Sequence, residues 1–455
     1  MGGDMLNAMK YISTVPFSGL FNWSVQYLND SKIAFSKAYP MMRIGEFLKR
    51  NKTTVVIEDD VIYKRPRIRV RNGGISLRDE ILGEKIGTKN QFLISKGQFL
   101  LSKIDARNGA FGVVPEKLDG GIITGNFWTF DVNYDIVNPH YLALLTTTKA
   151  FVNFCEQASN GTTNRHYLQE PLFLNIKVPI PSLAEQNKLV KEYNKQIFIA
   201  IDSERQVAAK YSDINAILLT ELGVNISKET AQKGLATVSF SSLDRWDIGY
   251  LQNTSKFSTK YKAVKFRDCI EYFMKSSNGK SLRIETYKTP SKDFRYIGME
   301  HIEKGTGQLL ETPIIKGAQV KSQTIAVPDG YFIYGKLRPY LNKYWYNDTN
   351  WENLVCSSEL FVFKVKESIN TRFFEIVLGS SIVQVQITDL TSGARMPRIT
   401  EDVFMNIQIP IPSFDIQNSI VKRIDKIKGE IKKLQQTATI KYSSALTNFE
   451  TLIFE

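Results

Sequence analysis

The strongest constraint on the fold of this chain is an internal repeat, in which blocks of sequence recur in the same order. FSGLFNWSVQYL at 17–28 corresponds to FSSLDRWDIGYL at 240–251. NIKVPIPSLAEQNKLVKEYN at 175–194 corresponds to NIQIPIPSFDIQNSIVKRID at 406–425, with nearly the same spacing between the copies. A repeat of this length indicates one structural unit used twice. The 455 residues are therefore expected to contain two copies, roughly at 17–224 and 240–455.

Two shorter matches inside the copies predict strands. Gly97-Gln-Phe before Lys103 corresponds to Gly330-Tyr-Phe before Lys336. The runs FWTFDV and LFVFKV are separated by the same interval and alternate in polarity, as half-buried strands do. Each copy is therefore expected to have a mixed α+β fold.

A long amphipathic pattern closes each copy, directly after a PIPS segment. Proline disfavours helix in the residue before it, so Ser182 and Ser413 are candidate N-caps. Apolar residues then recur at steps of three and four, which predicts a helix with one narrow apolar seam. The seam residues singled out are Val190, Tyr193, Ile197, Tyr211, Ile420, Ile424, Ile427, Ile431 and Leu434.

These two helices need a partner along their length. A helix of about 40 residues is about 60 Å long, which exceeds the width of a compact domain of this size. We expect the two seams to pack together as an antiparallel coiled pair with approximate two-fold symmetry, separating two duplicated mixed domains. The alternative is that each helix packs only on its own unit.

The charge of the chain favours a polyanionic partner. Lys and Arg number 59 against 46 Asp and Glu, which gives a net charge of +13. Three scattered cysteines and three histidines form no metal or disulfide pattern. Without a leader-like start or a stretch of about 18 apolar residues, the chain is expected to be a soluble cytoplasmic protein.

Two segments share part of a catalytic motif, and each has a simpler structural interpretation. Asn138-Pro-His-Tyr is similar to the NPPY motif of adenine methyltransferases, but an Asn N-cap followed by Pro explains it. Pro328-Asp329 before Lys336 has part of a PD-(D/E)xK nuclease pattern, but Asp-Gly is typical of a turn. We expect no catalytic residue and no metal site.

Basic and aromatic residues gather at matching places in the two copies. The alternation after Tyr63 places Arg67, Arg69 and Arg71 on one strand face, which is either solvated or turned toward phosphates. Arginine can bridge phosphates or read guanine, and asparagine can read adenine. The candidate DNA-binding residues are Lys64, Arg65, Arg67, Arg69, Arg71, Lys103, Arg107, Asn108, Thr163, Arg165, Lys336, Arg338, Tyr340, Lys343, Arg395 and Arg398.

The order of these blocks resembles the specificity subunit of type I restriction-modification systems, over nearly the whole chain. The segment 69–130 is also similar to a recurring type of target recognition domain in that family. The resemblance implies target recognition domains at 1–181 and 240–412, long conserved helices at 182–224 and 413–455, and a linker at 225–239.

The same resemblance implies the function and the partners. Each recognition domain would read one half of a bipartite, asymmetric site in double-stranded DNA. Two DNA adenine methyltransferase subunits would dock on the helices, and ATP-dependent restriction subunits would join them. S-adenosylmethionine, ATP and Mg²⁺ would bind these partners, so the chain itself would be non-catalytic and hold no cofactor. Two alternatives remain open, the recognition subunit of a methyltransferase-nuclease fusion system and a non-specific nucleic-acid-binding helical scaffold.

Overall fold

The computed structural model describes residues 33, 35–70, 73–160, 167–228, 255–320, 322–390 and 397–454. Its contacts divide the chain into two compact units, residues 1–203 with 436–455 and residues 204–435. The two Trp-containing repeat blocks, most of the expected linker, and the candidates Arg71, Thr163, Arg165 and Arg395 lie outside the described residues.

The first unit is built on a four-stranded antiparallel sheet in the order β2-β10-β7-β8. Its strands are β2 (Leu48–Asn51), β10 (Phe127–Val132), β7 (Phe99–Ser102) and β8 (Phe111–Val113). The FWTFDV run forms β10, as predicted, and Phe130 of this strand pairs with Arg50 on one side and Phe99 on the other. β10 therefore lies inside the sheet, and its central apolar residues, Trp128 and Phe130, are buried.

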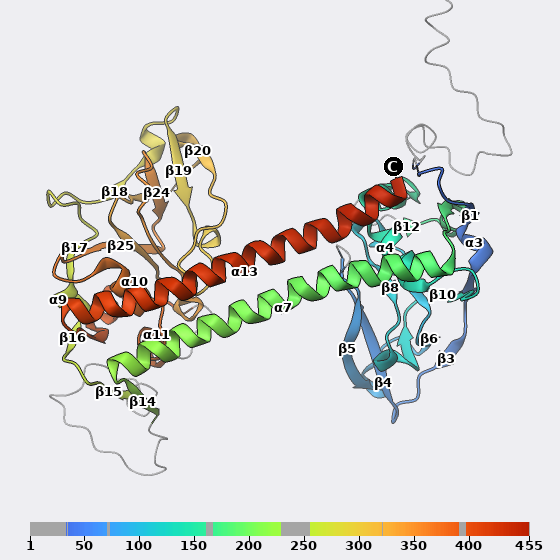
Figure 1. Ribbon diagram of the computed structural model, residues 1–455, viewed down its shortest axis with the longest axis horizontal. Helices are drawn as coiled ribbons and strands as arrows, with labels where there is room; N and C mark the ends of the chain where they lie inside the picture. Colours follow the sequence, from blue (N-terminus) through green and yellow to red (C-terminus); the bar gives the residue numbers. More distant parts are fainter. Residues whose placement is uncertain are drawn as a thin grey trace, which may run out of the picture. The chain divides into compact units, whose positions relative to one another are not determined.

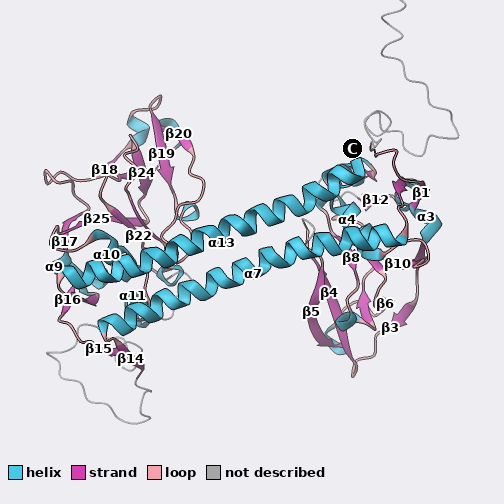
Figure 2. Ribbon diagram, viewed as in Figure 1, coloured by secondary structure: helices cyan, strands magenta, loops and turns pink. Residues whose placement is uncertain are grey.

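A second group of strands extends the first unit. It contains a three-stranded sheet of β3 (Thr54–Val56), β6 (Asn90–Ile94) and β9 (Gly121–Ile123), and a separate hairpin of β4 (Ile62–Ile68) and β5 (Ile75–Leu82). Shorter pairs join β1 (Met41–Arg43) to β13 (Lys177–Pro179) and β11 (Ser159–Asn160) to β12 (Tyr167–Leu168). Strands β3 to β6 lie on one side of α7 (Leu183–Leu222), in the lower part of the view (Figure 2).

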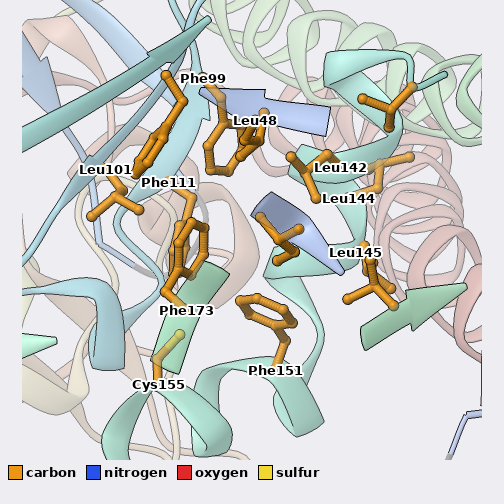
Figure 3. Close-up of a cluster of buried hydrophobic side chains, with 14 of the residues drawn as sticks. Leu48, Phe99, Leu101, Phe111, Leu142, Leu144, Leu145, Phe151, Cys155 and Phe173 are labelled. Carbon is orange, nitrogen blue, oxygen red and sulfur yellow. The ribbon is translucent and has the colours of Figure 1, made fainter. Parts of the chain in front are cut away.

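The helices of the first unit cover its four-stranded sheet. They are α3 (Ile44–Phe47), α4 (Pro139–Thr147), α5 (Lys149–Gln157) and α6 (Glu170–Asn175). Figure 3 shows Phe99 and Phe111 of the sheet packed with Leu145 of α4, Phe151 of α5 and Phe173 of α6. These five side chains are almost fully buried, so they anchor the helices on the sheet.

The second unit repeats this framework. Its four-stranded sheet has the order β17-β25-β22-β23, with β17 (Ile270–Phe273), β25 (Leu360–Val365), β22 (Phe332–Gly335) and β23 (Tyr344–Tyr346). β16 (Ala263–Lys265) pairs with β26 (Gln408–Pro410), as β1 pairs with β13. Its helices are α9 (Phe266–Cys269), α10 (Thr371–Leu378), α11 (Ser381–Leu390) and α12 (Glu401–Asn406). LFVFKV forms β25, as predicted.

The strands added to this framework differ between the units. In the second unit they form a five-stranded sheet in the order β18-β21-β24-β19-β20, in which β19 and β24 are parallel. The strands are β18 (Arg283–Ile284), β21 (Thr324–Ala326), β24 (Leu354–Ser357), β19 (Asp293–Ile297) and β20 (Ile314–Lys316). A last pair, β14 (Asn225–Lys228) and β15 (Ser255–Ser258), follows α7. The mixed α and β architecture expected from the sequence is thus present in both units.

Each long helix contributes one part to each unit (Figure 1). The helix α7 ends at Gly223, whose φ of +58° favours glycine, and α13 runs from Phe414 to Phe454. In the second unit, the ion pairs Lys210–Glu430 and Glu221–Arg423 show that the two helices run antiparallel. In the first unit, Tyr193 and Phe449 line one small hollow between them.

The apolar seam of α13 follows the predicted spacing. Ile424, Ile431, Ala438 and Ala445 are buried and recur at heptad spacing, as in a coiled coil. In α7, Ser203 is buried, and the neighbouring Glu204 is exposed. At this point of α7 the small hydroxyl of Ser203 faces the interior, and the carboxylate of Glu204 stays in water.

Two features of the described residues bear on the wider expectations from the sequence. No helix among them is both long enough and apolar enough to cross a membrane. The three cysteines are buried and free of disulfides. Burial raises the pKa of the Cys155 thiol well above its ordinary value, which disfavours the thiolate.

Candidate nucleic-acid interface

The hairpin of β4 and β5 carries most of the basic residues predicted near residue 65. Arg65 donates two hydrogen bonds of 2.8 Å to the carboxylate of Asp79, and this contact lowers the pKa of Asp79. Lys64 is half-buried, whereas Arg67 is exposed. The hairpin therefore uses Arg65 to hold its two strands together, and Arg67 is the basic side chain of β4 that reaches solvent.

The prediction that Arg67 and Arg69 lie together on one strand is wrong, and Arg71 lies outside the described residues. β4 ends at Ile68, and the backbone N–H of Arg69 donates to the carbonyl of Gly74 across the turn. A register shift between Arg65 and Pro66 separates Lys64 and Arg65 from the part of the strand that carries Arg67. Arg69 is therefore exposed in the hairpin turn and does not lie on a strand.

A loop after β7 carries the candidates Lys103, Arg107 and Asn108. It contains the short 3₁₀ helix η4 (Ala106–Asn108), which ends at Gly109 with a φ of +73°. Asp105 holds the loop, because its backbone N–H donates to Ser102 Oγ and its carboxylate accepts from Asn108 Nδ2. The ammonium of Lys103 lies 5.3 Å from the centre of the Tyr167 ring.

The matching loop of the second unit has a different backbone. Its 3₁₀ helix η10 (Pro339–Leu341) lies between Arg338, with a φ of +48°, and Asn342, with a φ of +47°. An L-residue in this left-handed region is disfavoured by about 1–2 kcal/mol, and arginine has no local hydrogen bond to offset it. The strain at Arg338 persists because its N–H donates to the carbonyl of Pro397 at 2.8 Å.

This backbone presents two side chains to solvent. Arg338 and Tyr340 are exposed, Tyr340 to 49% of its surface. Within the described ranges, neither side chain forms a hydrogen bond or an ion pair. A fixed loop that displays an arginine and a tyrosine in this way is suited to a partner rich in hydrogen-bond acceptors.

Three other basic candidates of the second unit, two half-buried and one exposed, already have partners within the protein. Lys336 donates to the carbonyl of Ser358 at 2.6 Å and lies 4.9 Å from the Phe361 ring, and burial lowers its pKa. Lys343 donates to the carbonyl of Met299 at 2.5 Å. Arg398 forms two hydrogen bonds with Glu359, at 3.0 and 3.2 Å. These residues build the surface around Arg338, and their cationic groups are already partnered.

The two catalytic-motif fragments have the structural roles that the sequence favoured. The side chain of Asn138 caps α4 by accepting from the N–H of His140, with Pro139 at the first helical position. Asp329-Gly330 forms a turn before β22, and Gly330 has a φ of +79°. In the described part of the chain, no three His, Cys, Asp or Glu residues cluster as metal ligands would.

Comparison with known proteins gives the family. The family model for the type I restriction modification DNA specificity domain matches residues 32–209 and again residues 259–442. The chain belongs to this family. Both matches fall on the duplicated framework, so the repeat consists of two specificity domains and the resemblance drawn from the sequence is confirmed.

Individual relatives agree with the family. The type I restriction enzyme MjaVIII specificity subunit of Methanocaldococcus jannaschii is 22% identical over 437 residues, which cover 90% of this chain and 91% of the relative. A chain from a structure on complex assembly and conformational transition of the type I R-M system matches with a TM-score of 0.52 at 16% identity, covering 92% and 98% of the two chains. The HsdS subunit from Thermoanaerobacter tengcongensis matches with a TM-score of 0.41 at 16% sequence identity. The match covers 94% of this chain and 99% of that subunit. Of the two structures, the first supports the shared fold.

One surface of the specificity-domain helices was missed by the sequence analysis, which considered only their seam. In the first unit, Phe198 and Ile201 of α7 are exposed to 70% and 53%, and Ile440 of α13 to 61%. When the two PIPS segments are aligned, the second unit has Gly429 and Lys432 in place of the first two. Phe198 and Ile201, three residues apart on α7, are neighbours on the helix surface, and two adjacent large apolar side chains in water mark a contact surface better than scattered single ones do. The sequence does carry a signal for this surface, because Phe198 and Ile201 are two apolar residues about one helical turn apart that do not belong to the seam.

Proposed function

We propose that this chain is the DNA specificity subunit of a type I restriction-modification complex. Each specificity domain reads one half of a bipartite, asymmetric site in double-stranded DNA. The observation that carries the proposal is the pair of specificity domains with one framework and different added strands. Because the added strands and the loop residues differ, the two half-sites differ in sequence.

The division of the chain follows from this role. Recognition domains occupy residues 1–181 and 240–412, and the helices at 182–224 and 413–455 set the distance between the half-sites. For two domains that approach one side of a duplex, a separation near one helical turn, about 34 Å or 10 base pairs, is expected. The chain acts as a non-catalytic recognition subunit in the cytoplasm.

The proposed DNA-contacting residues divide by their geometry. Arg67 and Arg69, on an exposed hairpin, suit phosphate contacts, which need charge but little precision. Arg338 and Tyr340 sit on a strained and anchored loop, which suits a contact to base edges. Lys103, Arg107 and Asn108 occupy the matching loop of the first domain. Thr163, Arg165 and Arg395 stay candidates from the sequence.

Partner subunits complete the activity. Two DNA adenine methyltransferase subunits dock on the long helices, where Phe198 and Ile201 offer apolar surface to one of them. ATP-dependent restriction subunits join the assembled methyltransferase. S-adenosylmethionine, ATP and Mg²⁺ bind to these partners, which supply methyl transfer, translocation and cleavage.

Selection from a random duplex library tests this proposal. The chain is purified together with a type I methyltransferase subunit of its host and incubated with the library, and the bound DNA is sequenced. Enrichment of one gapped, asymmetric motif is expected. Equal recovery of unrelated duplexes would favour the non-specific scaffold, and co-purification of one polypeptide with both methyltransferase and nuclease motifs would favour the fusion system.

A further inference from the structure

A buried amide ties the first recognition domain to its long helix. The side chain of Gln186, on the first turn of α7, is fully buried. Its Oε1 accepts the backbone N–H of Asn138 at 2.8 Å, and its Nε2 donates to the carbonyls of Pro181 at 2.8 Å and Ile136 at 3.0 Å. Next to it, Asn187 Oδ1 accepts from Asn138 Nδ2 at 2.7 Å. One side chain thus joins the long helix, the segment before it and the start of α4.

The second domain repeats the main contacts of this arrangement. Gln417 is 1% exposed, its Oε1 accepts the N–H of Asn370 at 2.8 Å, and its Nε2 donates to the carbonyl of Pro412 at 2.9 Å. Asn418 Oδ1 accepts from Asn370 Nδ2 at 2.7 Å. The residues before the two glutamines differ, Leu-Ala-Glu in one copy and Phe-Asp-Ile in the other. These contacts are the same although the three residues between PIPS and the glutamine have changed.

The asparagine in each group also caps a helix of the recognition domain. Asn138 Oδ1 accepts from the N–H of His140 at the start of α4, and Asn370 Oδ1 accepts from the N–H of Phe373 at the start of α10. Both polar atoms of the asparagine side chain are thereby used. The first turn of the long helix and the first turn of α4 or α10 are held by one continuous set of hydrogen bonds, which we term the helix-junction clamp.

In the second unit, the clamp connects through α10 to the loop that displays Arg338. At the far end of α10, the carbonyl of Gly379 accepts from Asn342 Nδ2 at 2.9 Å. Asn342 is the left-handed residue that ends η10. In the first unit, α5 follows α4 directly and packs against η4. One helix, α10, thus joins clamp and loop in the second unit, and the consecutive helices α4 and α5 join them in the first.

From these contacts we infer that Gln186 and Gln417 are positioning residues, which fix the direction of each recognition loop relative to its long helix and so fix the spacer that the subunit accepts. The inference rests on the proposed function. A buried glutamine that only filled space would be replaced by an apolar residue at little loss, whereas directional hydrogen bonds specify one orientation among several similar packings.

The test compares spacers on one set of half-sites. The whole methyltransferase complex is prepared with Gln417→Met, a substitution that keeps the length of the side chain and removes its hydrogen bonds. Methylation is measured on duplexes whose spacer has the natural length or is one base pair longer or shorter. The preference of the variant for the natural spacer is expected to fall about tenfold, while recognition of the half-sites is kept. Gln186→Met, the matching substitution in the first domain, is expected to lower the preference for the natural spacer in the same way.

Two further variants keep the test decisive. Asn418→Ala removes one exposed member of the clamp and should shift the spacer preference in the same direction by a smaller factor, whether or not Gln417→Met folds. Thr324→Val is the matched control, since Thr324 is fully buried and donates to the carbonyl of Ile284 in the five-stranded sheet. Methylation by the Thr324→Val complex should fall by the same factor at every spacer length.

The outcomes separate the inference from the proposed function. Equal loss at all three spacers for Gln417→Met and no shift for Asn418→Ala would overturn the positioning role. If the unmodified complex methylates no gapped site at any spacer, the proposed function itself fails. A broadened spacer preference in the clamp variants, with the preference of the control unchanged, would establish the role.

Discussion

The two specificity domains share the parts that connect them to the long helices and differ in the strands added to that framework. The four-stranded sheet, the β1–β13 and β16–β26 pairs and the helix-junction clamp occur in both. The added strands form a hairpin with a three-stranded sheet in the first unit and a five-stranded sheet in the second. The comparison shows that duplication has preserved the junction with the helices, while the added elements have diverged.

The two matching loops show the same division on a smaller scale. Both are 3₁₀ turns that end in a left-handed residue, Gly109 in one and Asn342 in the other. At the start of the loop, Asp105 has an ordinary φ of −103°, whereas Arg338 has a φ of +48°. The second domain therefore retains backbone strain at a residue whose side chain faces solvent. Strain at such a place is expected where the side chain has a function.

The largest effect should come from a charge in the buried seam. Ile424 and Ile431 are 0% and 2% exposed, so Ile424→Asp with Ile431→Asp should cost more than about 3 kcal/mol for each unpaired buried charge. Hydrogen exchange over α13 and size-exclusion of the complex measure the loss of the seam and of the assembly. On the other long helix, Tyr193 is only half-buried, so Tyr193→Asp should have a smaller effect. A complex that survives the double substitution would show that the helices do not depend on this seam.

The exposed helix face should distinguish the two docking positions that we propose for methyltransferase subunits. Phe198→Ala with Ile201→Ala removes apolar surface worth about 1.5–3 kcal/mol per buried side chain, which corresponds to a loss of tenfold or more in affinity. Titration of the methyltransferase into the chain, followed by native mass spectrometry, measures it. The matched control is Gly429→Ala with Lys432→Ala in the second unit, where no large apolar group is lost. Equal effects of the two pairs would rule out an asymmetric docking surface.

Arg338→Gly should separate stability from recognition. Glycine relieves the left-handed strain, so the free energy of unfolding is expected to rise by about 0.5–1 kcal/mol. Affinity for the natural site should fall about tenfold, because a base contact of an arginine is worth about 1–3 kcal/mol. Chemical denaturation and DNA binding measure both changes.

Asp105→Gly is the control for this loop. It should lower stability, since Asp105 has an ordinary backbone and accepts from Asn108. An Arg338→Gly protein that binds its site as tightly as the natural protein would remove Arg338 from the interface.

The hairpin should give the smallest and least specific effect. Arg67→Ala with Arg69→Ala is expected to weaken binding to all sequences alike and to reduce the slope of log affinity against log salt by about one per lost phosphate contact. Binding measured between low and moderate salt gives the slope. Arg65→Ala is the contrasting variant, since it breaks the pair with Asp79 and should loosen the hairpin itself. An unchanged salt slope would place the hairpin away from the DNA.

The sequence predicted the features that depend on local pattern. The long helices, the strands β10 and β25 and the cap at Asn138 follow from periodicity and from the preferences of single residue types. The repeat extended these local predictions to a two-domain architecture and to the family. Each of these local signals lies within or beside the element that it predicts.

The features that the sequence did not predict depend on partners far apart in the chain. Gln186 bonds to Asn138, Arg398 bonds to Glu359 and Lys343 bonds to Met299, and spacing carries no sign of any of these pairs. Arg69 was misplaced because β4 ends at Ile68 and the chain turns there. The backbone of Arg338 is set by its bond to Pro397, which comes from another loop.

The most direct test of the account is modified-base sequencing of host DNA with this gene intact and with it deleted. The account predicts that deletion removes N6-methyladenine at one gapped, asymmetric motif, whose two parts are the half-sites of the two domains. Identical methylation in the two strains, with the chain and its methyltransferase both expressed in the intact strain, would contradict the proposal that this protein selects the DNA sequence.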